Sequence, residues 1–193
     1  MLLKTAEILL AAFLLLPVYW ALHRLYFHNQ KKSCLYYLFA VYLCAVYLFV
    51  GLPTVFFLRF ELTLELIPFL PMAEDLKNTL LNVLLFVPLG MFLPFLWRKY
   101  RAAKATAAFG FGMSLAIETA QLFTYRATDV NDLIANTAGA ILGYLLFCVG
   151  SLIAPGITKT AGRKNEVLTV LLTILPIMFF LQPWLADLFY RIT

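Results

Sequence analysis

Three polar side chains recur at helical spacing in the apolar stretch SLAIETAQLFT. Ser114, Glu118 and Gln121 follow the i, i+4, i+7 pattern, which places residues on one face of a helix. Glu118 precedes Thr124 by six residues, or about 9 Å of helix. A carboxylate held inside a bilayer costs roughly 3 kcal/mol on insertion scales, so Glu118 is expected to face a helix bundle or a wet cavity.

The next apolar stretch, TDVNDLIANTAGAILG, begins with a second polar group. Asp132 and Asn136 lie one turn apart on one face, and Asp129 precedes them. The two carboxylates could hold Mg²⁺ or Ca²⁺ through oxygen ligands. Asp129 also fits an N-cap, with Asp132 at the spacing of a capping box, and the sequence leaves both interpretations open. Gly139 and Gly143 on the same stripe favour close helix packing.

A third stretch, KNTLLNVLLFVPLG, places Asn78 and Asn82 on one face at the start of a helix. The nearest basic residue is Arg126, which could pair with an acidic neighbour or bind an anionic head group as a planar fork. Three helices would thus carry polar groups at one depth of a membrane. We predict a ligand site there, formed by Asn82, Ser114, Glu118, Gln121, Arg126, Asp129, Asp132 and Asn136.

Familiar catalytic arrangements are missing from the sequence around these residues. No Ser-His, Cys-His or HExxH pattern occurs, and the two histidines, His23 and His28, lie far away in the chain. A buried Glu118 could still serve as a general acid or base. We therefore expect no cofactor, with a divalent cation at Asp129 and Asp132 as the one exception, and an enzyme is the less favoured class.

The composition requires a membrane around this site. The chain has 193 residues, of which 63% are hydrophobic and 13% charged. Soluble domains carry roughly 25% charged residues. Six runs are long enough to cross a bilayer as helices, which predicts an all-α bundle with about six spans at 5–22, 35–58, 79–97, 105–125, 132–154 and 167–186. We interpret the first run as a retained span and not as a cleaved signal peptide.

Basic residues orient the predicted bundle. Most of the 15 Lys and Arg fall in three connections, at 23–34, 98–104 and 155–166, whereas the acidic residues lie almost entirely elsewhere. The positive-inside rule makes those connections cytoplasmic, so both termini and the polar groups face outward. The sequence pI of about 9.2 then reflects topology and contact with anionic lipids, not nucleic-acid binding.

Three segments divide the chain in this interpretation: two helices at 1–58, a core of three helices at 59–154, and a final helix at 155–193. The outer connection at 58–78 contains ELTLELI, whose alternation suggests an extended or interfacial piece. Whether this connection re-enters the membrane is left open by the sequence.

The core segment resembles a known family. NVLLFVPLG, beginning at Asn82, then SLAIETAQ, from Ser114 to Gln121, then ATDVNDLIANTAG, ending at Gly139, are similar to the motifs of the VanZ-like family, in the family's order. The resemblance covers about residues 64 to 147. Leu66-Ile67-Pro68-Phe69 also resembles the family's outer-loop motif, with Glu65 where an Asn is common.

That resemblance implies a multi-pass protein of the bacterial cytoplasmic membrane with a role in glycopeptide resistance, since the family is named for a protein linked to teicoplanin resistance. We expect the site to bind or shield a membrane lipid, a lipid-linked envelope precursor or a lipoglycopeptide antibiotic. An intramembrane enzyme acting on a lipid-linked substrate through Glu118 is one alternative. A lipid transporter coupled to protonation of Glu118 is another, although the polar groups occupy only one half of the membrane.

Overall fold

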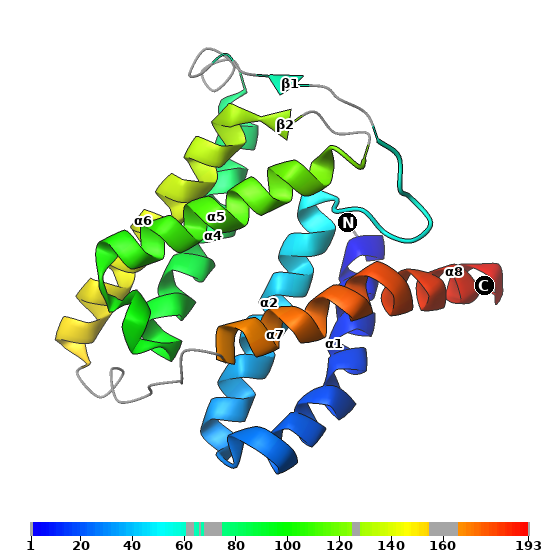
Figure 1. Cartoon of the computed structure of the whole chain (residues 1–193), viewed down its shortest axis with the longest axis horizontal. Coiled ribbons are helices and arrows are strands. Elements are labelled where there is room, and N and C mark those ends of the chain that lie inside the picture. The colour runs from blue at the N-terminus through cyan, green and yellow to red at the C-terminus, as the bar shows by residue number, and fades with distance from the viewer. Residues whose placement is uncertain are drawn as a thin grey trace. The chain divides into compact units, whose positions relative to one another are not determined.

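The computed structural model describes residues 2–60, 64–65, 67, 75–124, 128–154 and 166–192. They form two compact units, each with its own contacts: Met1–Leu58 with Asn165–Thr193, and Arg59–Lys164. Almost all of the described chain is helical, which confirms the all-α prediction (Figure 1). The division of the sequence into three segments stays a prediction.

The first unit is built from two antiparallel helices and a long bent one. Its elements are α1 (Leu2–Leu22), the π-helical turn η1 (His23–Phe27), α2 (Gln30–Val50), and a continuous run of α7 (Glu166–Pro176), η4 (Ile177–Leu181) and α8 (Gln182–Ile192). The Tyr36 hydroxyl donates to the Glu166 carboxylate at 2.5 Å, and both side chains are buried. This bond fixes the start of α7 against α2.

The second predicted span is wrong at its carboxyl end. We expected a helix to residue 58, but α2 ends at Val50. Gly51 adopts a left-handed conformation at φ 68° and its N–H donates to the Tyr47 carbonyl, which is a usual helix stop. Pro53 follows, and it disfavours helical conformation in the residue before it. The apolar run at 54–58 therefore lies outside the helix.

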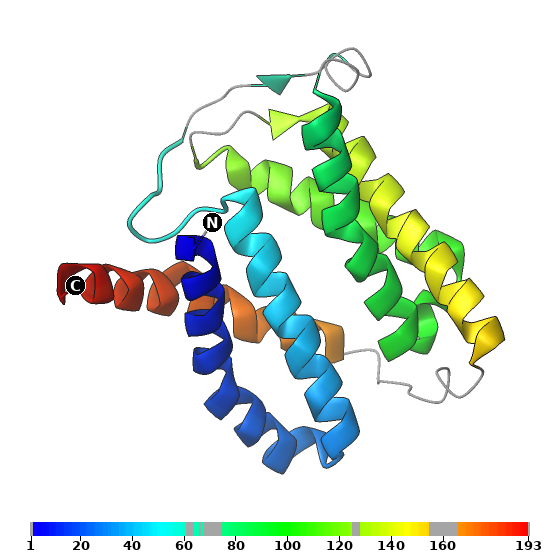
Figure 2. The same cartoon turned by 180° about the vertical axis from the view of Figure 1, so that it is seen from behind.

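The second unit holds the predicted site. It consists of β1 (Leu64–Glu65), α4 (Leu76–Leu96), the 3₁₀ turn η2 (Arg98–Arg101), α5 (Ala103–Gln121), β2 (Thr128–Asp129) and α6 (Val130–Ile153). Helix α6 packs against both α4 and α5. Figure 2 shows α4 and α6 running side by side, with the two strands at one end of the unit.

Small residues let α4 and α6 approach to backbone contact. A Cβ atom added at Gly139 would lie 2.2 Å from the Val83 carbonyl oxygen, and one added at Gly143 would lie 2.0 Å from that of Val87. Such approach is typical of helix pairs in membranes. The packing role predicted for these two glycines is confirmed, and α4 continues through Pro88 as one helix.

The two short strands pair Leu64–Glu65 with the residues just before α6. Leu64 pairs with Thr128 and Glu65 with Asp129 in a parallel arrangement. The extended conformation expected for ELTLELI is thus present at Leu64–Glu65. Ile67 is also described, but the other residues of that stretch and of the family-like motif from Leu66 to Phe69 lie outside the described residues.

Among the described residues, five helices are long and apolar enough to cross a membrane: Lys4–Phe27, Gln30–Val50, Leu76–Leu96, Val130–Ile153 and Glu166–Leu188. Helix α5 has 19 residues, but its polar stripe makes it less apolar than the others. The count of six spans and the outward position of both termini stay predictions.

Orientation can be tested by chemical labelling. Asp75 caps α4 at the end that carries the strands, and Lys99 lies in η2 at the opposite end. In a variant lacking the three native cysteines, a cysteine placed at Asp75 should react with an impermeant thiol reagent added to intact cells. A cysteine placed at Lys99 should react only after the cells are permeabilised. The reverse labelling would show that the positive-inside assignment is wrong.

Candidate polar site at one end of the second unit

The predicted stripe on α5 is buried as a unit. Ser114 is fully buried, and Glu118 and Gln121 are each 3% exposed. Their immediate neighbours Leu115 and Thr119 lie off this stripe and are exposed. The helical period in the sequence therefore identified the inward face of α5 correctly.

Glu118 joins the end of α5 to the start of α6. Its Oε2 accepts a hydrogen bond from the Asp129 backbone N–H at 2.9 Å. Its backbone carbonyl accepts one from the Thr128 hydroxyl at 3.0 Å. The buried carboxylate thus satisfies a backbone donor just before α6, where the helix macrodipole also favours negative charge. The hydrogen bond from the Asp129 N–H therefore offsets part of the free-energy cost of burying the Glu118 carboxylate.

Asp129 is the N-cap of α6, as one of the two sequence interpretations proposed. Its Oδ1 accepts from the Asn131 backbone N–H at 2.8 Å. The capping box is wrong for its second member, because the Asp129 N–H goes to Glu118 and not to Asp132. Glu118 of α5 thus accepts the hydrogen bond that the local pattern assigned to Asp132.

Asp132 instead connects α6 to α4. The Asn82 side-chain amide donates to Asp132 Oδ1, and both side chains are partly buried. Asn78, on the same face of α4 one turn earlier, is exposed. Of the two asparagines on this face of α4, Asn82 is therefore the one that contacts α6, and the bond to Asp132 could be found only from the tertiary structure.

Asn136 links α6 to α5 at the deepest level of the group. Its Nδ2 donates to the Ser114 hydroxyl at 2.9 Å, with both side chains buried. Among the described residues, no group donates to Asn136 Oδ1, which is itself buried. A buried acceptor without a donor costs about 1–3 kcal/mol, so a hydrogen bond to this atom from a water molecule or from a ligand would be favourable.

Asn131 belongs to the same group and was missed in the sequence. It is 3% exposed, and its Nδ2 donates to the Ile67 carbonyl at 3.0 Å and to Asp129 Oδ1 at 2.8 Å. It therefore joins Ile67 to the start of α6. Asn131 lies off the stripe of Asp132 and Asn136, so periodicity gave no signal for it.

Six of the eight predicted site residues are joined in pairs by hydrogen bonds in the structure, and Gln121 is buried on the same face of α5 as Glu118. We call these seven the polar cluster: Asn82, Ser114, Glu118, Gln121, Asp129, Asp132 and Asn136. The eighth, Arg126, lies outside the described residues. Within the described ranges, no group of three or more His, Cys, Asp or Glu side chains could hold a metal ion. The divalent cation at Asp129 and Asp132 stays a prediction.

The structural role of Glu118 can be separated from its charge. Glu118→Gln keeps an acceptor oxygen for the Asp129 N–H, so stability should change little. Glu118→Leu removes that acceptor, and the unpaired donor should cost about 1 kcal/mol or more. Thermal unfolding of the two variants in one detergent should therefore give a lower midpoint for Glu118→Leu. Equal midpoints would mean that this hydrogen bond contributes nothing to stability.

Comparison with known proteins identifies one relationship. A family model described as VanZ/LLP1 matches residues 8–153. The match is longer than the motif resemblance indicated, and it includes α2 and most of α1. No curated protein and no solved structure matches the chain. Together with the five apolar helices, the match identifies a multi-pass membrane protein.

Proposed function

The chain belongs to the VanZ/LLP1 family, and from this premise we propose that its polar cluster binds a polar group of a lipid, a lipid-linked envelope precursor or a lipoglycopeptide antibiotic. The site lies at the outer face of the bacterial cytoplasmic membrane. Binding there shields the target or the drug, and the expected consequence is a contribution to glycopeptide resistance.

The observation that carries this proposal is the buried oxygen of Asn136. Helix capping explains Asp129, and the bond from the Asp129 N–H accounts for one oxygen of Glu118. Neither explains why an amide oxygen without a donor lies beside buried Ser114, at the same end of the helices as the carboxylates. A ligand that brings hydrogen-bond donors into the polar cluster would satisfy it.

Chemistry narrows the class of ligand. The described members of the polar cluster are carboxylates, amides and one hydroxyl, and none is cationic. Such a set favours a group with several donors, namely the hydroxyls of a sugar or glycerol head group or a protonated amine. Membrane lipids, lipid-linked precursors and lipoglycopeptides all carry such groups next to an apolar chain that partitions into the bilayer.

A sensitivity assay tests the proposal in cells. The chain is expressed in a teicoplanin-sensitive Gram-positive host and compared with an empty vector. We expect reduced sensitivity to teicoplanin, whose acyl chain anchors it in the membrane, and little change for a glycopeptide without an acyl chain. Equal protection against both drugs would indicate an effect on the shared target. No protection against either would contradict a shielding role in resistance.

A further inference from the structure

The second unit contains an apolar pocket far from the polar cluster along α4 and α6. It has a volume of about 300 Å³, at the lower end for ligand-binding pockets. It lies over the last turns of the two helices. Its walls include Met91, Phe92 and Phe95 from α4, and Leu146, Phe147 and Gly150 from α6.

Gly150 helps to create this pocket. Helices α4 and α6 touch at Gly143, where an added Cβ atom would lie 2.0 Å from the Val87 carbonyl oxygen. Two turns later, a Cβ atom added at Gly150 would meet nothing within 4 Å. The backbones are therefore in contact in the middle of the helices and leave open space near their carboxyl ends. The open space is the pocket.

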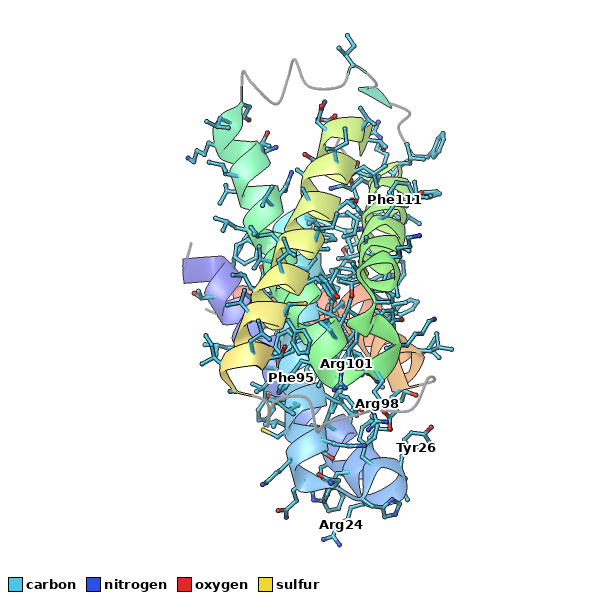
Figure 3. All side chains as sticks on the ribbon, turned by 90° about the vertical axis from the view of Figure 1, so that its left-hand side faces the viewer. Arg24, Tyr26, Phe95, Arg98, Arg101 and Phe111 are labelled. Atoms are coloured by element: carbon cyan, nitrogen blue, oxygen red, sulfur yellow. The ribbon has the colours of Figure 1, made fainter. Side chains whose placement is uncertain are left out.

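Basic residues come soon after the pocket-lining residues of α4 in the sequence. Phe95 lines it, and Arg98 and Lys99 come three and four residues later, both exposed. Figure 3 shows Phe95, Arg98 and Arg101 at the same end of the second unit, with Phe111 towards the other end. The apolar pocket and the positively charged turn thus lie at the same end of the second unit.

This basic turn is tied to both helices. Arg101 Nε donates to the Pro94 carbonyl at 3.3 Å, one of the carbonyls left without a partner at the end of α4. The Tyr144 hydroxyl of α6 donates to the Arg101 carbonyl at 2.9 Å. The backbone of η2, which carries Arg98 and Lys99, is therefore attached to both helices beside the pocket.

We propose that this pocket holds an acyl chain of a phospholipid with an anionic head group, whose phosphate lies at Arg98 and Lys99. The apolar walls pack against the acyl chain, but they do not distinguish one head group from another. Selectivity comes from the charges, each of which favours an anionic lipid about five-fold at a membrane surface. The site is separate from the polar cluster and does not depend on the proposed function.

Native mass spectrometry of the full-length chain in mild detergent tests this inference. The chain is titrated with phosphatidylglycerol or with phosphatidylcholine carrying the same acyl chains. Gly150→Leu fills the pocket from α6, and Gly112→Leu is the matched control, since a Cβ atom there also meets nothing within 4 Å. Leu146→Trp fills the pocket a second way, in case Gly150→Leu does not fold.

The charges are tested in the same titration. A double variant, Arg98→Gln with Lys99→Gln, removes two positive charges beside the pocket. As a control, Lys77→Gln removes an exposed positive charge at the other end of α4. We expect wild type, Gly112→Leu and Lys77→Gln to bind phosphatidylglycerol in preference to phosphatidylcholine. Either pocket-filling variant should lose bound phosphatidylglycerol, and the double variant should lose about five-fold for each charge. Unchanged binding in the pocket-filling variants, or equal binding of the two lipids by wild type, would overturn the proposal.

Discussion

A chain carrying Gly90→Ala is expected to unfold at a much lower temperature than the wild type. A Cβ atom at this position would lie 1.9 Å from the Ala140 carbonyl oxygen and 2.9 Å from the Ala140 Cα. Both atoms belong to the backbone of α6, so no side-chain rotation can relieve the clash and the helices must separate. Overpacking a rigid core costs about 1–3 kcal/mol or more, and we expect the upper part of that range.

Two other glycines serve as controls for this prediction. Gly112→Ala and Gly150→Ala add the same methyl group to a helix, but into open space. Their stability should equal or slightly exceed that of the wild type, because Ala is favoured over Gly in a helix by about 0.5–1 kcal/mol. Thermal unfolding of all four proteins in one detergent gives the comparison. Equal midpoints for Gly90→Ala and Gly112→Ala would show that α4 and α6 do not pack at backbone contact.

Glu118→Gln is expected to abolish protection against teicoplanin while leaving the protein folded in the membrane. The substitution keeps the shape and the acceptor for the Asp129 N–H but removes the charge that the proposed site offers to a ligand. Membrane insertion should not suffer, since loss of a buried charge removes an insertion penalty. The measurement is drug sensitivity of cells that contain matched amounts of wild type and variant.

Two substitutions nearby provide controls for the charge effect. Thr119→Val changes the next residue of α5, which is exposed and donates only to the Leu115 carbonyl of its own helix. It should protect as the wild type does. Asp129→Asn should have a milder effect than Glu118→Gln, because Asn caps helices about as well as Asp. Full protection by Glu118→Gln would mean that the carboxylate is purely structural.

The faces of the helices were predictable because burial follows the helical period. Ser114, Glu118 and Gln121 point inward together, and a carboxylate inside an apolar helix has few other stable positions. The hydrogen-bond partners of the polar side chains on neighbouring helices were not predictable. The sequence left Asp132 two roles, in a capping box with Asp129 or as a cation ligand, and its bond to Asn82 depends on the packing of α4 against α6.

Helix ends were predicted less well than helix faces. Apolar residues continue past Val50, so hydropathy extended α2 to residue 58, although Gly51 and Pro53 carried the stop signal. The hydrogen bond from Asn131 to the Ile67 carbonyl joins segments 64 residues apart. No local pattern in the sequence encodes such a contact, because it depends on how the outer segment meets the start of α6.

The proposal that the polar cluster binds a ligand is tested most directly by identifying what co-purifies with the protein. Wild type, Thr119→Val and Glu118→Gln are purified in mild detergent from the same host, and their extracts are compared by mass spectrometry. We predict one lipid, precursor or antibiotic, chemically unaltered and rich in hydroxyl or amine groups, that is present with the first two and absent with Glu118→Gln. A chemically altered lipid in the wild-type extract would favour an enzyme instead. Identical extracts from all three proteins would contradict ligand binding at the polar cluster.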